Sequence, residues 1–189
     1  MQAFLFDMIK LFKLEDYEVV VEPEALLLKP FKTLWDRDKR KDKSMAKQEL
    51  AFIFFVSDPR SDYQYIIDRE TRESQVILAL GMPEKWKPDK KVYEALDFYE
   101  SFKPVSAGLL EDTRVAVNKL REMLRNIDLD ERDKNDKPVH TLSSITQTIK
   151  QVPALVKDLD EAERTLSRDI AAEARARGSQ QKALFEDED

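Results

Sequence analysis

The chain of 189 residues contains no cysteine, 3 glycines and 1 histidine. The lack of cysteine excludes disulfide bonds, thiolate metal sites and thiol nucleophiles, and it is compatible with a reducing cytosol. Strand-rich folds need glycine for tight hairpins, so its scarcity favours helices joined by short polar connections. No apolar run approaches the roughly 20 residues that span a bilayer, so we expect no membrane-spanning segment.

Charged residues, in contrast, are abundant. They make up 37% of the chain, and hydrophobic residues make up 42%, which is enough to bury a sizeable core beneath a heavily charged surface. The net charge of -6 argues against nucleic-acid binding over the whole surface but permits a local basic face. The N-terminal sequence MQAFLFDMIKLFKL carries charges within its apolar pattern and has no small-residue cleavage site, so we expect no secretory signal.

The first 30 residues combine a helical pattern with an extended one. Apolar residues at helical spacing predict an N-terminal helix, and they are Phe4, Leu5, Met8, Ile9 and Phe12. We expect this helix to pack on the core; a membrane-surface helix is the alternative, which the lack of a basic polar face disfavours. The β-branched run YEVVVEP predicts a short strand or extended connector over 17–21. Pro23 then suits the first turn of a helix that Pro30 would bend or interrupt.

A block of charged residues, 36–43, lies just ahead of a strongly apolar run. Ser44 suits the N-cap of a helix over SMAKQELAFIFFVSD. Residues 50–56 have no polar face, which predicts a helix that is buried on all sides or covered by partner subunits. A buried strand is the alternative, because phenylalanine, isoleucine and valine also favour strands.

The sequence between residues 57 and 104 predicts three further helices. A turn and a short helix come first, and a longer helix ends near Gly81, which suits a left-handed C-cap. Residues 83–90, with two prolines, form a linker. The next amphipathic helix follows Val92, Leu96 and Tyr99, and Pro104 stops it.

The C-terminal part of the chain has the clearest periodicity. Residues spaced alternately three and four apart form a coiled-coil-like seam, interrupted by the polar stretch DLDERDKNDKP. The seam contains Leu110, Thr113, Val117, Leu120, Leu124, Ile127, Leu142, Ile145, Ile149, Val152, Val156, Leu159, Glu163, Leu166 and Ile170. Two such helices joined by a polar loop predict an antiparallel hairpin or two members of a bundle. Pro153 predicts a kink or a restart.

These patterns together predict a mainly α protein, a helical bundle with a long C-terminal helical hairpin and one short strand or extended segment near 17–21. Residues 1–104 form the helical core region with an N-terminal arm, and residues 105–176 form the hairpin. An acidic tail is expected to be disordered over 177–189.

Residues that carry chemistry are few and scattered. The single histidine, His140, lies beside the predicted loop, where we expect a surface or capping role. The carboxylates are spread among lysines and arginines, as on solvated helix faces, without the spacing of a metal site. The sequence has no glycine-rich phosphate loop and no nucleophile elbow. We therefore predict that the chain is not an enzyme and uses no cofactor or metal.

The charge block remains a candidate contact surface. Residues 29–47 contain eight basic and three acidic side chains, so their local charge is +5. The candidate residues for a partner or DNA are Lys39, Arg40, Lys41 and Lys43. The alternative is a solvated helix end with local ion pairs, each contributing a few tenths of a kcal/mol. The interleaved aspartates favour this alternative, or a protein partner, over DNA.

The segment KPFKTLWDRDKRKDKSMAKQELAFIFFVSDPRSDYQYI, residues 29–66, resembles a segment of structural proteins of tailed bacteriophages. The nearest are those of large-genome phages of gut Bacteroidota, including the crAss-like group. The shared pattern is LWDRDK, a KDKS turn, an aromatic-rich helix and SDPRSDYQ. The resemblance implies a mostly helical, ring-forming virion protein of the neck, which connects head to tail as a portal adaptor or an adjacent ring.

The resemblance also implies partners and a location. The partners would be copies of the chain in a cyclic homo-oligomer of about 12, the portal, and other neck or tail proteins, with passive contact to passing DNA and none to membranes. The protein would be made in the host cytoplasm and reside in the virion. The alternatives are a scaffold, cargo or packaged virion protein, and a cytoplasmic nucleic-acid-binding or regulatory helical protein, whose retention on DNA would fall steeply with salt.

Overall fold

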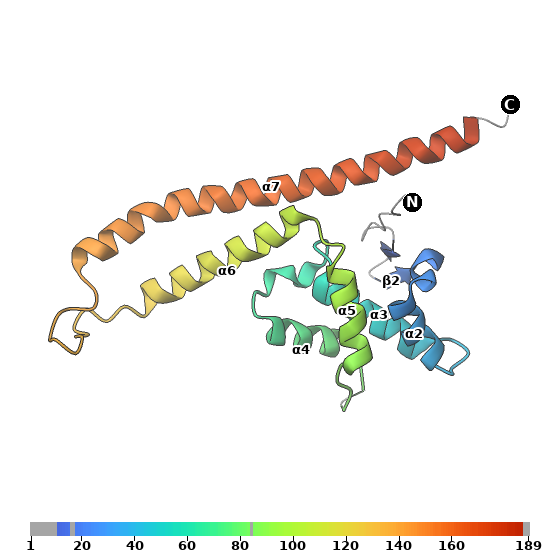
Figure 1. The fold of residues 1–189 in the computed structure, drawn as a ribbon, viewed down its shortest axis with the longest axis horizontal. Helices are drawn as coiled ribbons and strands as arrows, with labels where there is room; N and C mark the ends of the chain where they lie inside the picture. The colour runs from blue at the N-terminus through green and yellow to red at the C-terminus, as the bar shows by residue number, and fades with distance from the viewer. Residues whose placement is uncertain (1–10, 16–17, 84, 187–189) are drawn as a thin grey trace. The chain divides into compact units, whose positions relative to one another are not determined.

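The computed structural model describes residues 11–15, 18–83 and 85–186 (Figure 1), with side chains described up to residue 172. The described chain is mainly helical with one small sheet, as the sequence predicted. It divides into two compact units, residues 1–104 and 105–189. The predicted N-terminal helix lies outside the described residues except at its end, where Phe12 begins a β-strand instead.

The first unit consists of a strand pair followed by short helices. The strands are β1 (Phe12–Glu15) and β2 (Glu18–Val21), and they pair antiparallel with Phe12 opposite Val21. The 3-10 helix η1 (Pro23–Leu27), α2 (Lys29–Arg37), α3 (Ser44–Ser57), the 3-10 helix η2 (Asp62–Tyr65), α4 (Arg69–Ala79) and α5 (Lys90–Glu100) follow in order.

The sequence predicted β2 but not its partner. Strand β2 falls within the extended segment expected over 17–21. Strand β1 was missed because Phe12 continues the helical spacing of the preceding apolar residues, and because the rest of β1 is exposed and carries no pattern of its own. The backbone groups of β2 need hydrogen-bond partners, and β1 supplies them.

The two early prolines act as predicted. Pro23 opens η1, and Pro30 lies in the first turn of α2, where a missing N–H costs no helical hydrogen bond. Leu28, between the two helices, is extended, so the helical path is interrupted there. This short break lets α2 pack against both η1 and α3.

Helix α3 is the centre of the first unit. It contacts α2, α4, α5, β2 and η2, and Leu50, Phe52, Ile53, Phe54 and Val56 are all buried. Elements on every side explain why 50–56 needs no polar face, so helix is the correct alternative and strand the wrong one. Edge-to-face ring contacts, such as Phe12 with Tyr99 at a centroid distance of 5.0 Å, extend this core to β1 and α5.

The ends of α4 and the course of α5 follow the sequence prediction. Gly81 adopts a left-handed φ of 59°, and the N–H groups of Gly81 and Met82 donate to the carbonyls of Leu78 and Ile77. This is the Schellman arrangement that ends a helix with glycine. In α5, the predicted core positions Val92, Leu96 and Tyr99 are all buried.

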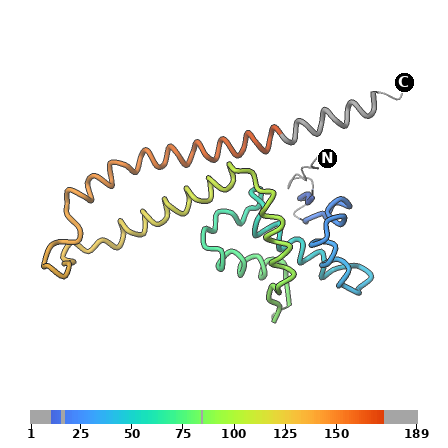
Figure 2. Tube along the Cα trace, in the orientation of Figure 1, coloured from blue at the N-terminus to red at the C-terminus, as the bar shows by residue number. Residues whose placement is uncertain are grey.

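The second unit is a helical hairpin. Helices α6 (Val105–Arg125) and α7 (Leu142–Glu186) run antiparallel and side by side, joined by the loop 126–141 (Figure 2). The sequence prediction of a long C-terminal hairpin is therefore confirmed. Within the loop, Asp136 has a φ of 58° and the N–H of Val139 donates to the carbonyl of Glu131, which closes a turn.

Helix α7 is longer and more continuous than the sequence predicted. Of the two alternatives predicted at Pro153, a kink or a restart, the restart is wrong, because the helix continues through Pro153 as a single element. The helix also extends through Gly178 to Glu186, where the sequence predicted a disordered tail from 177. Residues 187–189 lie outside the described part of the chain.

Candidate functional site

The charge block folds into a loop between α2 and α3 that its own side chains hold together. The carboxylate of Asp38 accepts hydrogen bonds from the backbone N–H groups of Arg40 (3.0 Å) and Ala46 (3.0 Å). These two bonds lower the pKa of Asp38 below its ordinary value. The predicted N-cap was wrong: Ser44 is the first helical residue, and Asp38 satisfies an N–H of the first turn from a distance in sequence.

Two basic residues of the block are also turned inward. Lys43 has a φ of 54°, and its Nζ donates to the carbonyls of Trp35 (3.1 Å) and Asp38 (2.6 Å) while lying 5.9 Å from the centroid of the Trp35 ring. The guanidinium of Arg37 donates to the buried carboxylate of Glu49 in α3 and to Asp89. The block therefore fixes the N-terminal end of α3.

The structure separates the four candidate residues of the basic block. Lys43 is half-buried and used by the loop, whereas Lys39, Arg40 and Lys41 are exposed on it. Lys39 Nζ donates to the carbonyl of Asp36, and Arg40 donates to the hydroxyl of Ser44. Lys39, Arg40 and Lys41 thus lie together on one short exposed loop, as a local basic face requires. Lys43 instead has a structural role.

The SDPRSDYQ motif fixes the opposite end of α3 with a buried polar cluster. Asp58 has no exposed surface, and its carboxylate accepts hydrogen bonds from the guanidinium of Arg60 (2.7 and 2.8 Å) and from the hydroxyl of Tyr99 (2.5 Å). Arg60 also donates to the carbonyl of Phe12 and lies over the ring of Phe54. One buried ion pair therefore joins α3, α5 and β1.

Neighbouring residues satisfy the last carbonyls of α3. Gln64 and Arg72 both donate to the carbonyl of Val56, at 3.0 Å each. Burial, together with the charge of Asp58, raises the pKa of Tyr99 well above its ordinary value, so this hydroxyl stays protonated and donates. The motif thus has a structural function, because the charges of Asp58 and Arg60 are directed at backbone or side-chain groups of the same unit.

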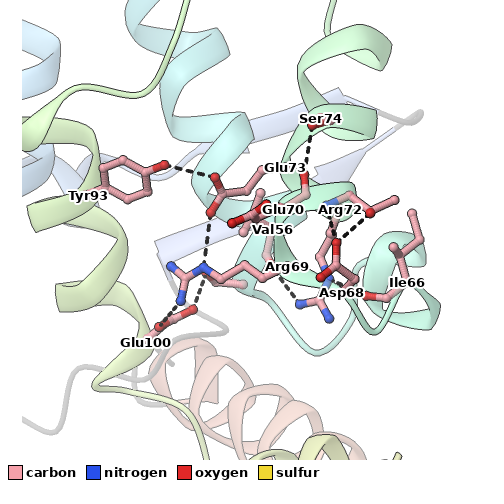
Figure 3. Close-up of polar contacts among 12 residues, drawn as sticks. Val56, Ile66, Asp68, Arg69, Glu70, Arg72, Glu73, Ser74, Tyr93 and Glu100 are labelled. Carbon is pink, nitrogen blue, oxygen red and sulfur yellow. Dashed lines mark hydrogen bonds and ion pairs between the residues drawn. The ribbon is translucent and has the colours of Figure 1, made fainter. Parts of the chain in front are cut away.

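A third polar cluster joins α4 to α5 (Figure 3). Asp68 caps α4, accepting from the N–H and hydroxyl of Thr71, and these bonds lower its pKa. Arg69 forms ion pairs with Glu73 (3.1 Å) and with Glu100 (3.7 Å) of α5. The hydroxyl of Tyr93 donates to Glu73 across the same contact. These groups are paired with one another rather than convergent on a free space.

The hairpin buries less apolar surface than its sequence offers. Its buried cluster consists of Ala107, Leu110, Ala162 and Leu166, with Leu159 and Ile170 packed against it. Between residues 145 and 166 of α7, the less exposed residues recur three and four apart, and they are Ile145, Thr148, Val152, Leu155, Leu159, Ala162 and Leu166. Two inter-helix bonds fix the register: Ser106 donates to Asp169, and Arg114 pairs with Glu163 at 2.8 Å.

Part of the predicted seam lies outside this contact. On the α6 side, Leu110 is buried and Val117, Leu120, Leu124 and Ile127 are half-buried. On α7, Leu142, Ile149 and Val156 are exposed by 73%, 53% and 46%. We call these three residues, spaced seven apart, the apolar row. The sequence prediction placed these three residues in the seam because α7 carries apolar residues at three positions per heptad. Such a stripe is wider than one neighbouring helix can cover.

The other flank of the hairpin carries a groove of about 610 Å³ between α6 and α7. We call it the hairpin groove; it is lined by Ser106, Leu109, Asp112, Thr113, Ala116, Val117, Leu155, Asp158, Glu161, Ala162 and Thr165. Leu109 is 60% exposed at its edge. The sequence analysis missed this groove; its only signal was the acidic stretch DLDEAE, residues 158–163, within the second helix.

The described residues show no gathering of three or more histidine, aspartate or glutamate side chains that could hold a metal ion. His140 lies 3.7 Å from Glu131 in the hairpin loop, within its own unit. Among the helices that the structure describes, none is long and apolar enough to cross a membrane. Comparison of the chain with protein-family models, curated proteins and solved structures finds no match.

Proposed function

We propose that this chain is a structural protein of a tailed-phage virion, a ring-forming component of the neck that acts as a portal adaptor or an adjacent ring. The observation that carries the proposal is the apolar row that the hairpin leaves uncovered. Three large exposed aliphatic side chains recur at one heptad position, so they form a stripe along one side of α7. Such a stripe is stabilised when a neighbouring subunit covers it.

The resemblance of residues 29–66 to phage structural proteins gives the proposal its context. In the described residues, the charge block and the SDPRSDYQ motif of this segment hold the two ends of α3. The residues that carry the resemblance therefore form the framework of the first unit. A rigid unit of this kind presents its exposed loop 39–41 in a fixed place. On a ring subunit, interleaved charges there would set the register of a contact more than its affinity.

The partners in this proposal are other copies of the chain and the portal or adjacent neck proteins. A ring closes when each subunit contacts the next with two different surfaces related by a rotation. The hairpin offers two different flanks, one with the apolar row and one with the groove. No nucleotide, metal or substrate is required for such a contact.

Quantitative mass spectrometry of purified phage particles tests the proposal. We expect the chain in mature particles at about 12 copies, the number that the resemblance implies for a ring matched to the portal, which closes by rotation. A scaffold would be absent from mature particles, and a packaged protein would leave with the genome when the particle is opened. Absence of the chain from mature particles would overturn the proposal.

A further inference from the structure

An ion pair joins two basic segments of the first unit that are far apart in the sequence. The guanidinium of Arg37, at the end of α2, donates to the carboxylate of Asp89, the N-cap of α5, over 2.6 Å. Arg37 belongs to the charge block, 36–43, and Asp89 belongs to the segment 85–91. The sequence predicted a linker over most of this second segment, and no signal connected its lysines with the block.

Helix α3 supports both segments. The ring of Trp86 packs edge to face on that of Phe52, with 5.3 Å between the centroids. The side-chain amide of Gln48 donates to the carbonyl of Leu80, where the chain leaves α4. The charge block is fixed to the start of the same helix, so the two segments have a common support.

Seven exposed cations lie on these two segments. We call them the basic face, and they are Lys39, Arg40, Lys41, Lys85, Lys87, Lys90 and Lys91. Each is within four residues of Arg37 or Asp89 in the sequence. Because consecutive Cα atoms are about 3.8 Å apart, the Cα of each cation lies within about 15 Å of the Cα of Arg37 or Asp89. The seven cations are therefore gathered around a single ion pair.

The aspartates that interrupt the two segments in the sequence do not balance the basic face. Asp38 is buried, and its carboxylate accepts two backbone N–H groups of the same part of the chain. Asp89 accepts a backbone N–H of the first turn of α5 as well as the guanidinium of Arg37. The exposed aspartates of the two segments are Asp36, Asp42 and Asp89, so exposed cations outnumber them by seven to three.

The cations also keep their charge, because their partners are neutral or weakly held. Lys39 donates to a backbone carbonyl and Arg40 to a serine hydroxyl, and neither group compensates a positive charge. Lys90 lies 3.8 Å from Glu94, but the two side chains are 90% and 60% exposed, and such a surface pair contributes little.

The basic face is an exception on an acidic chain. The segments 36–43 and 85–91 contain nine basic and four acidic residues and so carry +5, whereas the whole chain carries -6. A polyanion is therefore repelled by most of the chain and attracted to this face.

The face lacks the apolar centre that a protein partner needs. Within 36–43 and 85–91, every residue of which the structure describes, no large hydrophobic side chain is exposed. Protein interfaces gain most of their affinity from buried aromatic and apolar residues inside a polar rim. Phosphates, in contrast, are bound by cations, and contacts to phosphates carry no base-sequence information.

We propose that the basic face binds the phosphate backbone of nucleic acid without reading the base sequence. The inference goes beyond the proposed function, because ring formation needs no nucleic acid, and it does not depend on that function. It differs from the expectation for the charge block alone, because it assigns an equal part to the lysines of 85–91.

Fluorescence anisotropy of the purified full chain with two short DNA duplexes of unrelated sequence tests the inference. We expect both duplexes to bind with similar affinity at about 50 mM salt. The affinity should fall steeply towards about 200 mM salt, because each phosphate contact releases bound counterions.

Two charge-neutralised forms of the chain test the two segments separately. The loop variant carries Lys39→Gln, Arg40→Gln and Lys41→Gln, and the linker variant carries Lys87→Gln, Lys90→Gln and Lys91→Gln. Each should weaken binding at low salt at least about tenfold and reduce the slope of log affinity against log salt by about 2–3. All six positions are exposed, so we expect unchanged midpoints of urea unfolding.

A matched control carries Lys119→Gln, Lys150→Gln and Lys157→Gln, three exposed lysines of the second unit, and changes the net charge by the same amount. It should bind DNA within about twofold of the unaltered chain. A second control retains the charges of the linker segment with Lys87→Arg, Lys90→Arg and Lys91→Arg, and it should keep the affinity.

The inference is overturned if the unaltered chain does not bind DNA at low salt, or if the linker variant binds as tightly as the matched control. It is also overturned if poly-glutamate of equal charge displaces the protein as well as the duplex does, because the face would then suit an acidic protein surface. DNA binding by the purified chain decides this inference, whereas mass spectrometry of particles decides the virion proposal, so the failure of one is distinguished from the failure of the other.

Discussion

Asp58 has no exposed surface, yet it carries a charge that three hydrogen bonds from side chains compensate. A buried carboxylate is tolerated only when its partners are in place, since an unpaired charge in the interior costs several kcal/mol. Asp58, Arg60 and Tyr99 therefore form one cluster, and the loss of any member should weaken the packing of α3, β1 and α5 together.

Removing the Tyr99 hydroxyl tests this cluster with little change of shape. Tyr99→Phe should lower the free energy of unfolding by about 1.5–3 kcal/mol, the range for a hydrogen bond to a charged group. The matched control is Tyr65→Phe, which removes the hydroxyl of a side chain that is 74% exposed and should change stability by less than about 0.5 kcal/mol. Urea unfolding measures both. Equal effects of the two substitutions would contradict the assigned role of Asp58.

Asp38 gives the stability of the loop 38–46 a predictable dependence on pH. Its pKa is lowered in the folded chain by the N–H groups of Arg40 and Ala46, so its contribution is complete above the ordinary aspartate pKa of about 3.9. The contribution is lost as the pH falls through the lower pKa of the folded state. Asp38→Asn should therefore be less stable than the unaltered chain near neutral pH.

Urea unfolding of Asp38→Asn and of the unaltered chain at a series of pH values checks this expectation. The gap between their unfolding midpoints should narrow below about pH 4, because the unaltered carboxylate then becomes neutral as well. A gap that stays constant down to the acid limit of folding would show that Asp38 does not act through its charge.

At the scale of elements, Gly81 and Gly108 have opposite backbone requirements. Gly81 has a left-handed φ that a side chain disfavours, whereas Gly108 is inside α6, and at both positions a Cβ would meet nothing within 4 Å. Gly81→Ala should therefore destabilise α4 by about 1 kcal/mol, and Gly108→Ala should stabilise α6 by about 0.5–1 kcal/mol. Hydrogen exchange of the two helices reports each effect locally. The same sign at both positions would contradict the backbone argument.

The seam and the apolar row should also separate in experiment. Leu159 packs in the hairpin cluster, so Leu159→Asp should speed hydrogen exchange in α6 as the hairpin loosens. Ile149→Asp changes an exposed position and should leave that exchange rate unchanged, while weakening assembly. If Ile149→Asp loosened the hairpin as much as Leu159→Asp does, the row would belong to the seam.

The elements that the sequence predicted well are those in which one local signal decides the structure. Gly81 ends α4 because only a left-handed residue completes the cap, and residues 50–56 need surroundings on every side whichever element they form. The failures occurred where a distant group decides. Asp38 replaces Ser44 in satisfying the start of α3, and β2 recruits β1, whose own residues carry no strand pattern.

The candidate surfaces also differ in whether a local signal or a distant group decides them. Periodicity placed Leu142, Ile149 and Val156 on an apolar face, but only the position of α6 decides which part of that face is covered. The acidic groove was missed because Asp112 and Asp158 come together only through hairpin pairing. Of the basic block, Lys43 is directed inward by the left-handed backbone at its own position, which a charge count does not reveal.

At the scale of the whole molecule, the two units differ in how much apolar surface they bury. The first unit buries its own core around α3. The second buries only a small cluster and leaves apolar surface on both flanks. We therefore propose that the chain is stabilised most when its second unit stacks against other copies.

Sizing the purified full-length chain by mass photometry, alone and together with the portal protein of the phage that we propose encodes it, tests this proposal most directly. The account predicts a closed oligomer of about 12 copies, either free or formed on the portal. A chain that remains a monomer both alone and with the portal, at every concentration tried, would contradict it.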